Sequence, residues 1–153
     1  MEKKIMGLFG RFKAPKATIS VMLNKDTYSL KEPLTGTVNV SSSEEFDANE
    51  VRLEIWVNEW TKATEKQGTK EKPITVTAQQ NSVLHQSKNS IGGQMQFIDG
   101  FSDSIDFSIH LPSGVPPTYR SQNARNNWMM KGVIAVKGRP DVTSHDMEVV
   151  ITY

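Results

Sequence analysis

The chain has 153 residues, of which 37% are hydrophobic and 23% are charged, and its formal net charge at pH 7 is +1. This length supports one domain with a proper core, and the near-neutral charge gives no reason to expect a nucleic-acid partner. The sequence contains no cysteine and no run approaching the ~20 apolar residues of a membrane span, which excludes disulfides, thiol chemistry and a membrane-spanning helix.

The first 16 residues form a basic segment with a helical apolar pattern. They carry five basic residues against Glu2, a net charge of +4, which leaves −3 for the rest of the chain. Ile5, Leu8, Phe9 and Phe12 recur at helical spacing. One interpretation is a segment that packs over the domain. The other is weak, reversible contact with an anionic membrane surface, through Lys3, Lys4, Ile5, Leu8, Phe9, Arg11, Phe12 and Lys13.

The same segment does not resemble a secretory signal. Six residues separate Lys4 from Arg11, fewer than the roughly 7–15 apolar residues of a signal peptide. We therefore expect a cytoplasmic protein, with any membrane contact being peripheral.

From residue 17 onward the hydrophobic pattern has the two-residue period of β-strands. No helical period follows residue 16, which argues against a parallel α/β fold. Besides seven clear strands, an eighth is expected near Tyr28. We predict an all-β domain over 17–153, a two-layer antiparallel immunoglobulin-like β-sandwich of seven to eight strands. The seven clearest runs are 17–23, 34–40, 51–57, 74–84, 105–111, 128–136 and 147–153.

Irregularities and connections can also be predicted from the pattern. Gly36 interrupts its run, which indicates a bulge or a close backbone approach. The phase of the alternation slips near Val83 and Leu84, which indicates a bulge or turn. The polar stretches 61–73, 87–100 and 113–127 are expected to be loops between the strands.

No arrangement of residues predicts catalysis, a metal or a cofactor. No two of His85, His110 and His145 have the spacing of a local metal-ligand pair. Asp106, Ser108 and His110 share a strand face, but residues four apart on a strand lie ~13 Å from each other, too far for a catalytic triad. The acidic residues around His145 lack the pattern of a calcium loop and are better explained by a turn.

Two tryptophans on the polar face of their strand are the strongest candidates for partner binding. Trp56 and Trp60 either are covered by a loop or the N-terminal segment, or form an exposed interaction surface; stacking onto sugars is a third interpretation. Trp128 leads an apolar face and is expected in the core. Tyr119, Arg120 and Arg125 are either partner contacts or ordinary solvated loop residues.

Several phrases of the sequence, taken in order, resemble the arrestin N-terminal domain family, and most closely microbial arrestin-like proteins such as the bacterial sporulation-control family. The resemblance covers nearly all of residues 17–153. It is carried by 17–23 with 28–38, by 49–55, by 107–112 with Pro116-Pro117-Thr118, and by 128–136 with Arg139-Pro140-Asp141-Val142.

The resemblance implies a two-sheet sandwich and a non-catalytic adaptor that binds a protein partner, with partner peptides adding along an exposed strand edge. Arrestins usually join two such sandwiches, and this chain has room for one. We therefore expect two copies to pair as a homodimer through an open face or edge. The alternative function is a carbohydrate-binding or adhesive module outside the cell.

Overall fold

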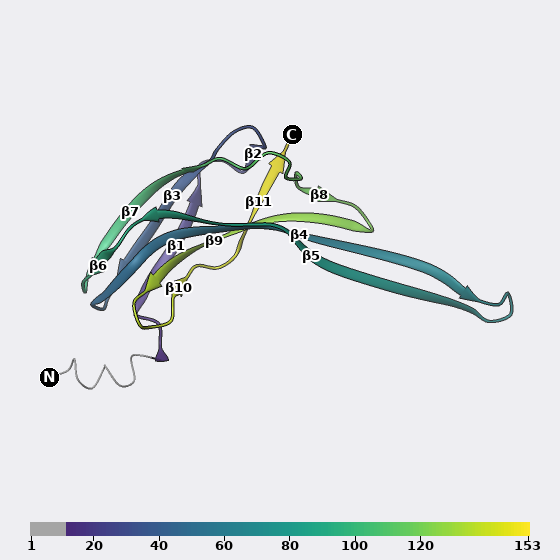
Figure 1. Ribbon diagram of the computed structural model, residues 1–153, viewed down its shortest axis with the longest axis horizontal. Coiled ribbons are helices and arrows are strands. Elements are labelled where there is room, and N and C mark those ends of the chain that lie inside the picture. The colour runs from purple at the N-terminus through teal and green to yellow at the C-terminus, as the bar shows by residue number, and fades with distance from the viewer. Residues whose placement is uncertain (1–11) are drawn as a thin grey trace.

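The computed structural model describes residues 12–153, which form eleven strands (Figure 1). Seven of them have six or more residues and correspond to the seven predicted runs, and β2 is the predicted strand at Tyr28. The strands are β1 (Ala17–Leu23), β2 (Thr27–Ser29), β3 (Leu34–Ser42), β4 (Phe46–Gly68), β5 (Pro73–Gly92), β6 (Met95–Phe97), β7 (Ser102–Ile109), β8 (Tyr119–Arg120), β9 (Ala124–Val136), β10 (Val142–Thr143) and β11 (Met147–Thr152).

The strands build two layers. The smaller sheet has the order β1-β3-β7, and the larger one has the order β2-β11-β9-β4-β5, with β6 paired to β4 and both β8 and β10 paired to β9. These pairs are antiparallel except for β2 with β11, which is parallel. The predicted sandwich is confirmed, with this one parallel pair as a refinement.

The core lies between the two sheets and follows the predicted alternation. In β4, Val51, Leu53, Ile55 and Val57 are buried, while the residues between them face away from the core. The facing sheet contributes Leu34, Val38 and Val40 from its central strand. Because side chains alternate along a strand, one buried face on each sheet is enough to fill the space between them.

Two of the predicted irregularities are present. Gly36 lies where an added Cβ would be 2.2 Å from the carbonyl oxygen of Met22, which confirms a close backbone approach. The pairing of β4 with β5 shifts register between Val57 and Asn58, opposite the segment from Val83 to His85. This is the bulge predicted from the slip in phase.

The predicted loop at 61–73 is wrong. β4 continues to Gly68, β5 begins at Pro73, and the two form a hairpin that extends well beyond the other strands (Figure 1). The β4 half of the hairpin beyond Lys62 is exposed and polar apart from Ala63, so no apolar alternation marks it as strand, whereas the alternation of Ile74, Val76 and Ala78 does predict the β5 half. Cross-strand pairing decides the structure instead, as where Thr64 lies opposite Thr77.

The other two predicted loops are also shorter than expected. β5 continues to Gly92 and β6 follows at Met95, inside the stretch 87–100. β8 and the first residues of β9 occupy part of the stretch 113–127. The added residues of β5 and β9 are mostly polar, and β6 has only three residues, so neither gives an apolar alternation long enough to predict a strand.

The N-terminal segment is tied to the domain at its end. Residues 1–11, and with them Lys3, Lys4, Ile5, Leu8, Phe9 and Arg11, lie outside the described residues. Phe12 is exposed, and the carbonyl oxygen of Lys13 accepts a hydrogen bond from Nε of Arg139 at 3.1 Å. The membrane contact of this segment therefore stays a prediction.

Glu44 connects this end of the chain to the turn after β9. Its carboxylate accepts hydrogen bonds from Nη1 of Arg139 at 2.6 Å and from the backbone N–H of Lys16 at 2.8 Å. Burial by itself raises the pKa of Glu44, but these hydrogen bonds and the nearby positive charge outweigh it and hold the pKa below its ordinary value of 4.5.

This lowered pKa predicts a loss of stability in acid. The ionised carboxylate stabilises the folded state above the unfolded pKa, and the contribution is lost as the pH falls through the folded pKa. We expect Glu44→Gln to be less stable than the wild type at pH 7 and to lose less stability between about pH 5 and pH 3, as measured by urea unfolding. Equal losses for both proteins over this range would contradict the role of Glu44.

Candidate functional site

The solvent-facing side of β4 and β9 brings together the aromatic and basic residues singled out in the sequence. We call this surface the outer face; it is made by Trp56, Trp60, Arg125, Met129 and Lys131. Register places Trp56 opposite Met129 and Trp60 opposite Arg125. Trp56 and Trp60 are both half-buried, and they lie on the side of the strand away from the core. The alternation that buries Val57 therefore presents both indoles on the solvent side.

Trp56 lies beside a cation and a hollow in the surface. Nζ of Lys131 is 5.8 Å from the centroid of the Trp56 ring, within range of a cation–π interaction. An open hollow of about 200 Å³ adjoins the indole. It is lined by Glu54, Trp56, Asn58, Val83, Gln86 and Lys131.

Trp60 lies against a guanidinium group. Cζ of Arg125 is 4.3 Å from the ring centroid, and the indole N–H donates a hydrogen bond to Oε1 of Gln79 at 3.3 Å. Arg120 is the register partner of Arg125 and forms an ion pair with Glu148. The outer face thus continues across β8 to β11.

Tyr119 does not join this surface. It is the register partner of Asn126, and side chains of neighbouring residues on a strand point to opposite sides of the sheet. Tyr119 is exposed, but on the side of the sheet away from Arg120. Four of the five residues predicted as partner contacts therefore share one face: Trp56, Trp60, Arg120 and Arg125.

The contacts of the two indoles come from neighbouring strands. Lys131 and Arg125 belong to β9, and Gln79 belongs to β5. Within residues 12–153, these contacts therefore come from strands and not from a covering loop, which is one of the predicted alternatives. Most of the N-terminal segment, the other possible cover, lies outside the described residues. Sequence reasoning missed Lys131, although the burial of Trp128 and Met130 on the same strand implies that Met129 and Lys131 face away from the core.

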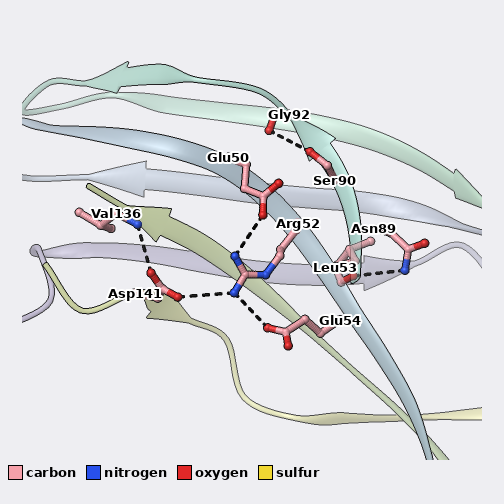
Figure 2. A network of polar contacts seen from close by, with 9 residues as sticks. All are labelled: Glu50, Arg52, Leu53, Glu54, Asn89, Ser90, Gly92, Val136 and Asp141. Atoms are coloured by element: carbon pink, nitrogen blue, oxygen red, sulfur yellow. Dashed lines mark hydrogen bonds and ion pairs between the residues drawn. The ribbon is translucent and has the colours of Figure 1, made fainter. Parts of the chain in front are cut away.

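An ion cluster surrounds Arg52 of β4 (Figure 2). Arg52 lies on the same side of the strand as the two tryptophans, so the cluster extends the outer face toward the start of β4. The guanidinium of Arg52 lies 3.2 Å from Glu50, 3.4 Å from Glu54 and 3.5 Å from Asp141, and its side chain is 15% exposed. Asp141 also accepts a hydrogen bond from the backbone N–H of Val136 at 3.2 Å. Three carboxylates around one cation make this end acidic, whereas the tryptophan end is basic.

Asp141 has a structural role in this cluster. Its two carboxylate oxygens join the β9–β10 turn to β4, as Figure 2 shows. Within the predicted turn around His145 the structure places the short strand β10, and Ser144 to Asp146 connect β10 to β11. Among the described residues, no group of three or more His, Asp or Glu side chains is placed to hold a metal ion.

The histidines do not form a site with one another. His85 lies on the core side of β5, with its ring centroid 6.0 Å from that of Trp128. His110 is exposed just after β7, and Asp106, four residues earlier, accepts a hydrogen bond from Thr37 at 2.9 Å. Asp106 therefore serves the pairing of β3 with β7. Over residues 12–153, no helix is long and apolar enough to cross a membrane.

Comparisons with known proteins agree on the fold. The family described as "Arrestin (or S-antigen), N-terminal domain" matches residues 18–153. The chain is similar in structure to Spo0M, a sporulation control protein from Bacillus subtilis, with a TM-score of 0.64, 16% identity, and coverage of 92% of this chain and 51% of Spo0M. It thus spans about half the length of that protein. No curated protein sequence matches the chain.

A second solved structure comes from an enzyme. AvmM, whose title states that it catalyses macrocyclization in alchivemycin A biosynthesis, has a TM-score of 0.50 and 7% identity, with coverage of 92% of this chain and 90% of AvmM. At such identities both structures show the fold alone. The arrestin-like family is generally non-enzymatic. Because the family match spans nearly the whole sandwich, the chain belongs to the arrestin N-terminal domain family.

Proposed function

We propose that this chain is a non-catalytic adaptor that binds a protein partner through the outer face. The observation that carries the proposal is the pair of half-buried tryptophans, each with a cation over its ring, on the solvent side of a sheet. Tryptophan and arginine are enriched among the residues that dominate binding energy at protein interfaces. A protein-interaction role also agrees with the arrestin-like fold.

The charge pattern supports a partner with two complementary patches. Arg125 lies at the Trp60 end of the outer face, Lys131 lies opposite Glu54 in its middle, and Glu50 and Asp141 surround Arg52 at the acidic end. A surface with both signs of charge orients a partner, because only one docking direction pairs opposite charges. Such complementarity increases specificity and the rate of association more than affinity.

The same geometry disfavours the carbohydrate-binding alternative. Sugars stack on an open aromatic face, but Arg125 lies 4.3 Å from the Trp60 ring and Lys131 lies 5.8 Å from the Trp56 ring. A sugar would have to displace these cations from the rings. A cytoplasmic location and peripheral membrane contact through the first residues remain part of the proposal.

We expect the double substitution of Trp56 and Trp60 by alanine to abolish partner capture. Each hot-spot residue contributes about 2 kcal/mol or more, so affinity should fall at least ~30-fold per tryptophan. The measurement is quantitative affinity capture from the native cell with the full chain as bait. The Met22→Ala variant is the matched control, because Met22 is an exposed apolar residue of β1, on the opposite sheet.

The decisive result is a protein retained by the wild type and by Met22→Ala but lost by the double variant. Circular dichroism and unfolding curves of the three proteins separate lost binding from lost folding. If no captured protein depends on the tryptophans, the outer face is not the binding surface. Specific retention on a glycan array would instead support the carbohydrate-binding alternative.

A further inference from the structure

The hairpin of β4 and β5 carries an arm that extends beyond the sandwich. The pairing of β4 with β9 ends at Thr61, and from there the two strands of the hairpin pair only with each other (Figure 1). We call residues 63–78 the arm. It comprises the end of β4, a turn at residues 69–72 and the start of β5.

The arm leaves apolar side chains in water. Ile74 is 56% exposed and Val76 is 41% exposed. Ala63 and Ala78 lie opposite each other in register, and they share the face of Val76 because strand residues two apart point to the same side. An isolated two-stranded ribbon is marginally stable in water at best, so a further strand would stabilise the arm.

The two edges of the arm differ in charge. The β4 edge carries Glu65 and Lys66, whereas β5 has no Asp, Glu, Lys or Arg from Pro73 to Ser87. β5 is also the last strand in the order of the larger sheet. Proteins usually protect a free strand edge with charges, above all lysine, against pairing with another chain. The β5 edge of the arm lacks this protection.

We propose that two copies of this chain pair through the β5 edges of their arms. The strands run antiparallel about a two-fold axis at Val76, so that Val76 lies opposite Val76 of the second copy. The segment reads Ile74-Thr75-Val76-Thr77-Ala78, a pattern that is symmetric about its centre. This register places Ile74 opposite Ala78 and Thr75 opposite Thr77, and it brings no two charges together.

No other antiparallel register matches all three apolar residues. Moving the axis to Thr75 or Thr77 leaves one of Ile74, Val76 and Ala78 opposite a polar residue or beyond the strand. The neutral, symmetric segment therefore favours a second copy over an unrelated strand. In the dimer the arms form one four-stranded ribbon, with the apolar residues of both copies gathered on one face.

The proposed pairing gives a closed dimer, because it leaves no unprotected strand edge in the arm. After β5 pairs with β5, the ribbon's outer edges are the two β4 strands, which carry Glu65 and Lys66. These charges oppose the addition of further strands. A two-fold dimer is therefore expected rather than a filament.

The test is sedimentation of the full chain at micromolar concentration. The wild type should sediment at twice the 17.1 kDa of the single chain, and Val76→Lys should sediment as a single chain. Val76 lies opposite Glu65 within its own arm, so a lysine there gains an oppositely charged cross-strand neighbour and the arm is not weakened. Across the two-fold axis, however, it places two lysines within ~5 Å of each other.

Thr64→Lys is the matched control, because it adds the same charge to the β4 edge and should leave the dimer intact. The chain has no cysteine, so Val76→Cys gives a single thiol that should form a disulfide-linked dimer on oxidation, unlike Thr64→Cys. A wild type that sediments as 17.1 kDa overturns the proposal. So does a Val76→Lys variant that remains dimeric. The former result would leave the edge open to a strand from a different protein.

Discussion

Trp128→Ala is expected to destabilise the domain by about 3–5 kcal/mol, a large part of the stability of a protein this size. The Trp128 side chain is 0% exposed, and its indole N–H donates a hydrogen bond to the carbonyl oxygen of Pro116 at 2.8 Å. Truncation removes a large apolar side chain, leaves a cavity and orphans a carbonyl in a part-buried position. Urea unfolding of the purified variant, followed by circular dichroism, measures the effect.

Two further variants separate the causes. Trp128→Phe keeps most of the packing but leaves the Pro116 carbonyl unpaired, so its cost should lie nearer 1–3 kcal/mol. Trp56→Ala removes an indole of the same size from the half-exposed outer face and should cost less than either change at Trp128. A Trp128→Ala variant no less stable than Trp56→Ala would mean that Trp128 does not anchor the core.

The core could be predicted because it depends on alternation alone. Val51, Leu53, Ile55 and Val57 are spaced by two, and the structure buries all four on one side of β4. Trp128 belongs to the same kind of run on β9. Where one face of a strand is buried, the register is strongly constrained, and the constraint is visible in the sequence as apolar residues spaced by two.

Only the β5 half of the arm could be predicted in this way, from the alternation of Ile74, Val76 and Ala78. Residues 64–73 are solvated on both faces, so no apolar period distinguishes strand from loop there. Their conformation depends on pairing between two polar strands and on a turn that contains neither an Asn-Gly nor an Asp-Gly signal. Glu65 opposite Val76 gives no pattern that a single strand would reveal.

The candidate site also has a part that could be predicted from the sequence and a part that could not. Alternation alone places Trp56 and Trp60 on the outer face. The partners of the site come from strand register across long sequence separations: Lys131 reaches Trp56 from β9, and Asp141 reaches Arg52 across 89 positions. Such contacts depend on which strands are neighbours, which local patterns do not encode.

The phrases that resemble arrestins have physical roles in the closure of the sandwich. Tyr28 is buried, and its hydroxyl donates a hydrogen bond to the carbonyl oxygen of Thr35 at 2.7 Å. Thr118 binds β11 through both its backbone and its hydroxyl, which accepts from the backbone N–H of Ile151 at 2.8 Å. These residues hold loops and short strands against the sheet ends. Their order along the chain therefore carries information about the fold.

Gly36→Ala should destabilise the domain by about 1–3 kcal/mol or more, although it adds only one methyl group. Gly36 lies in the central strand of the smaller sheet, paired with Leu23 on one side and Phe107 on the other. A Cβ at this position would be 2.2 Å from the carbonyl oxygen of Met22 and 2.8 Å from Cζ of Phe107. The ring can rotate, but the carbonyl belongs to a paired strand, so the backbone of β1 or β3 has to move.

Substitutions at two other glycines provide a comparison for the loss of stability expected at Gly36. A Cβ at position 93 would have no atom within 4 Å, so Gly93→Ala should leave stability unchanged or slightly higher, because alanine restricts the unfolded chain more than glycine does. A Cβ at position 132 would lie 2.9 Å from Cδ1 of Ile19. The Ile19 side chain can shift at a lower energetic cost than backbone can, so Gly132→Ala should destabilise the domain less than Gly36→Ala. Urea unfolding should therefore rank the losses as Gly36, then Gly132, then Gly93. If Gly36→Ala proved as stable as Gly93→Ala, β1 and β3 would not approach each other closely at this point, and the pairing of the smaller sheet would need revision.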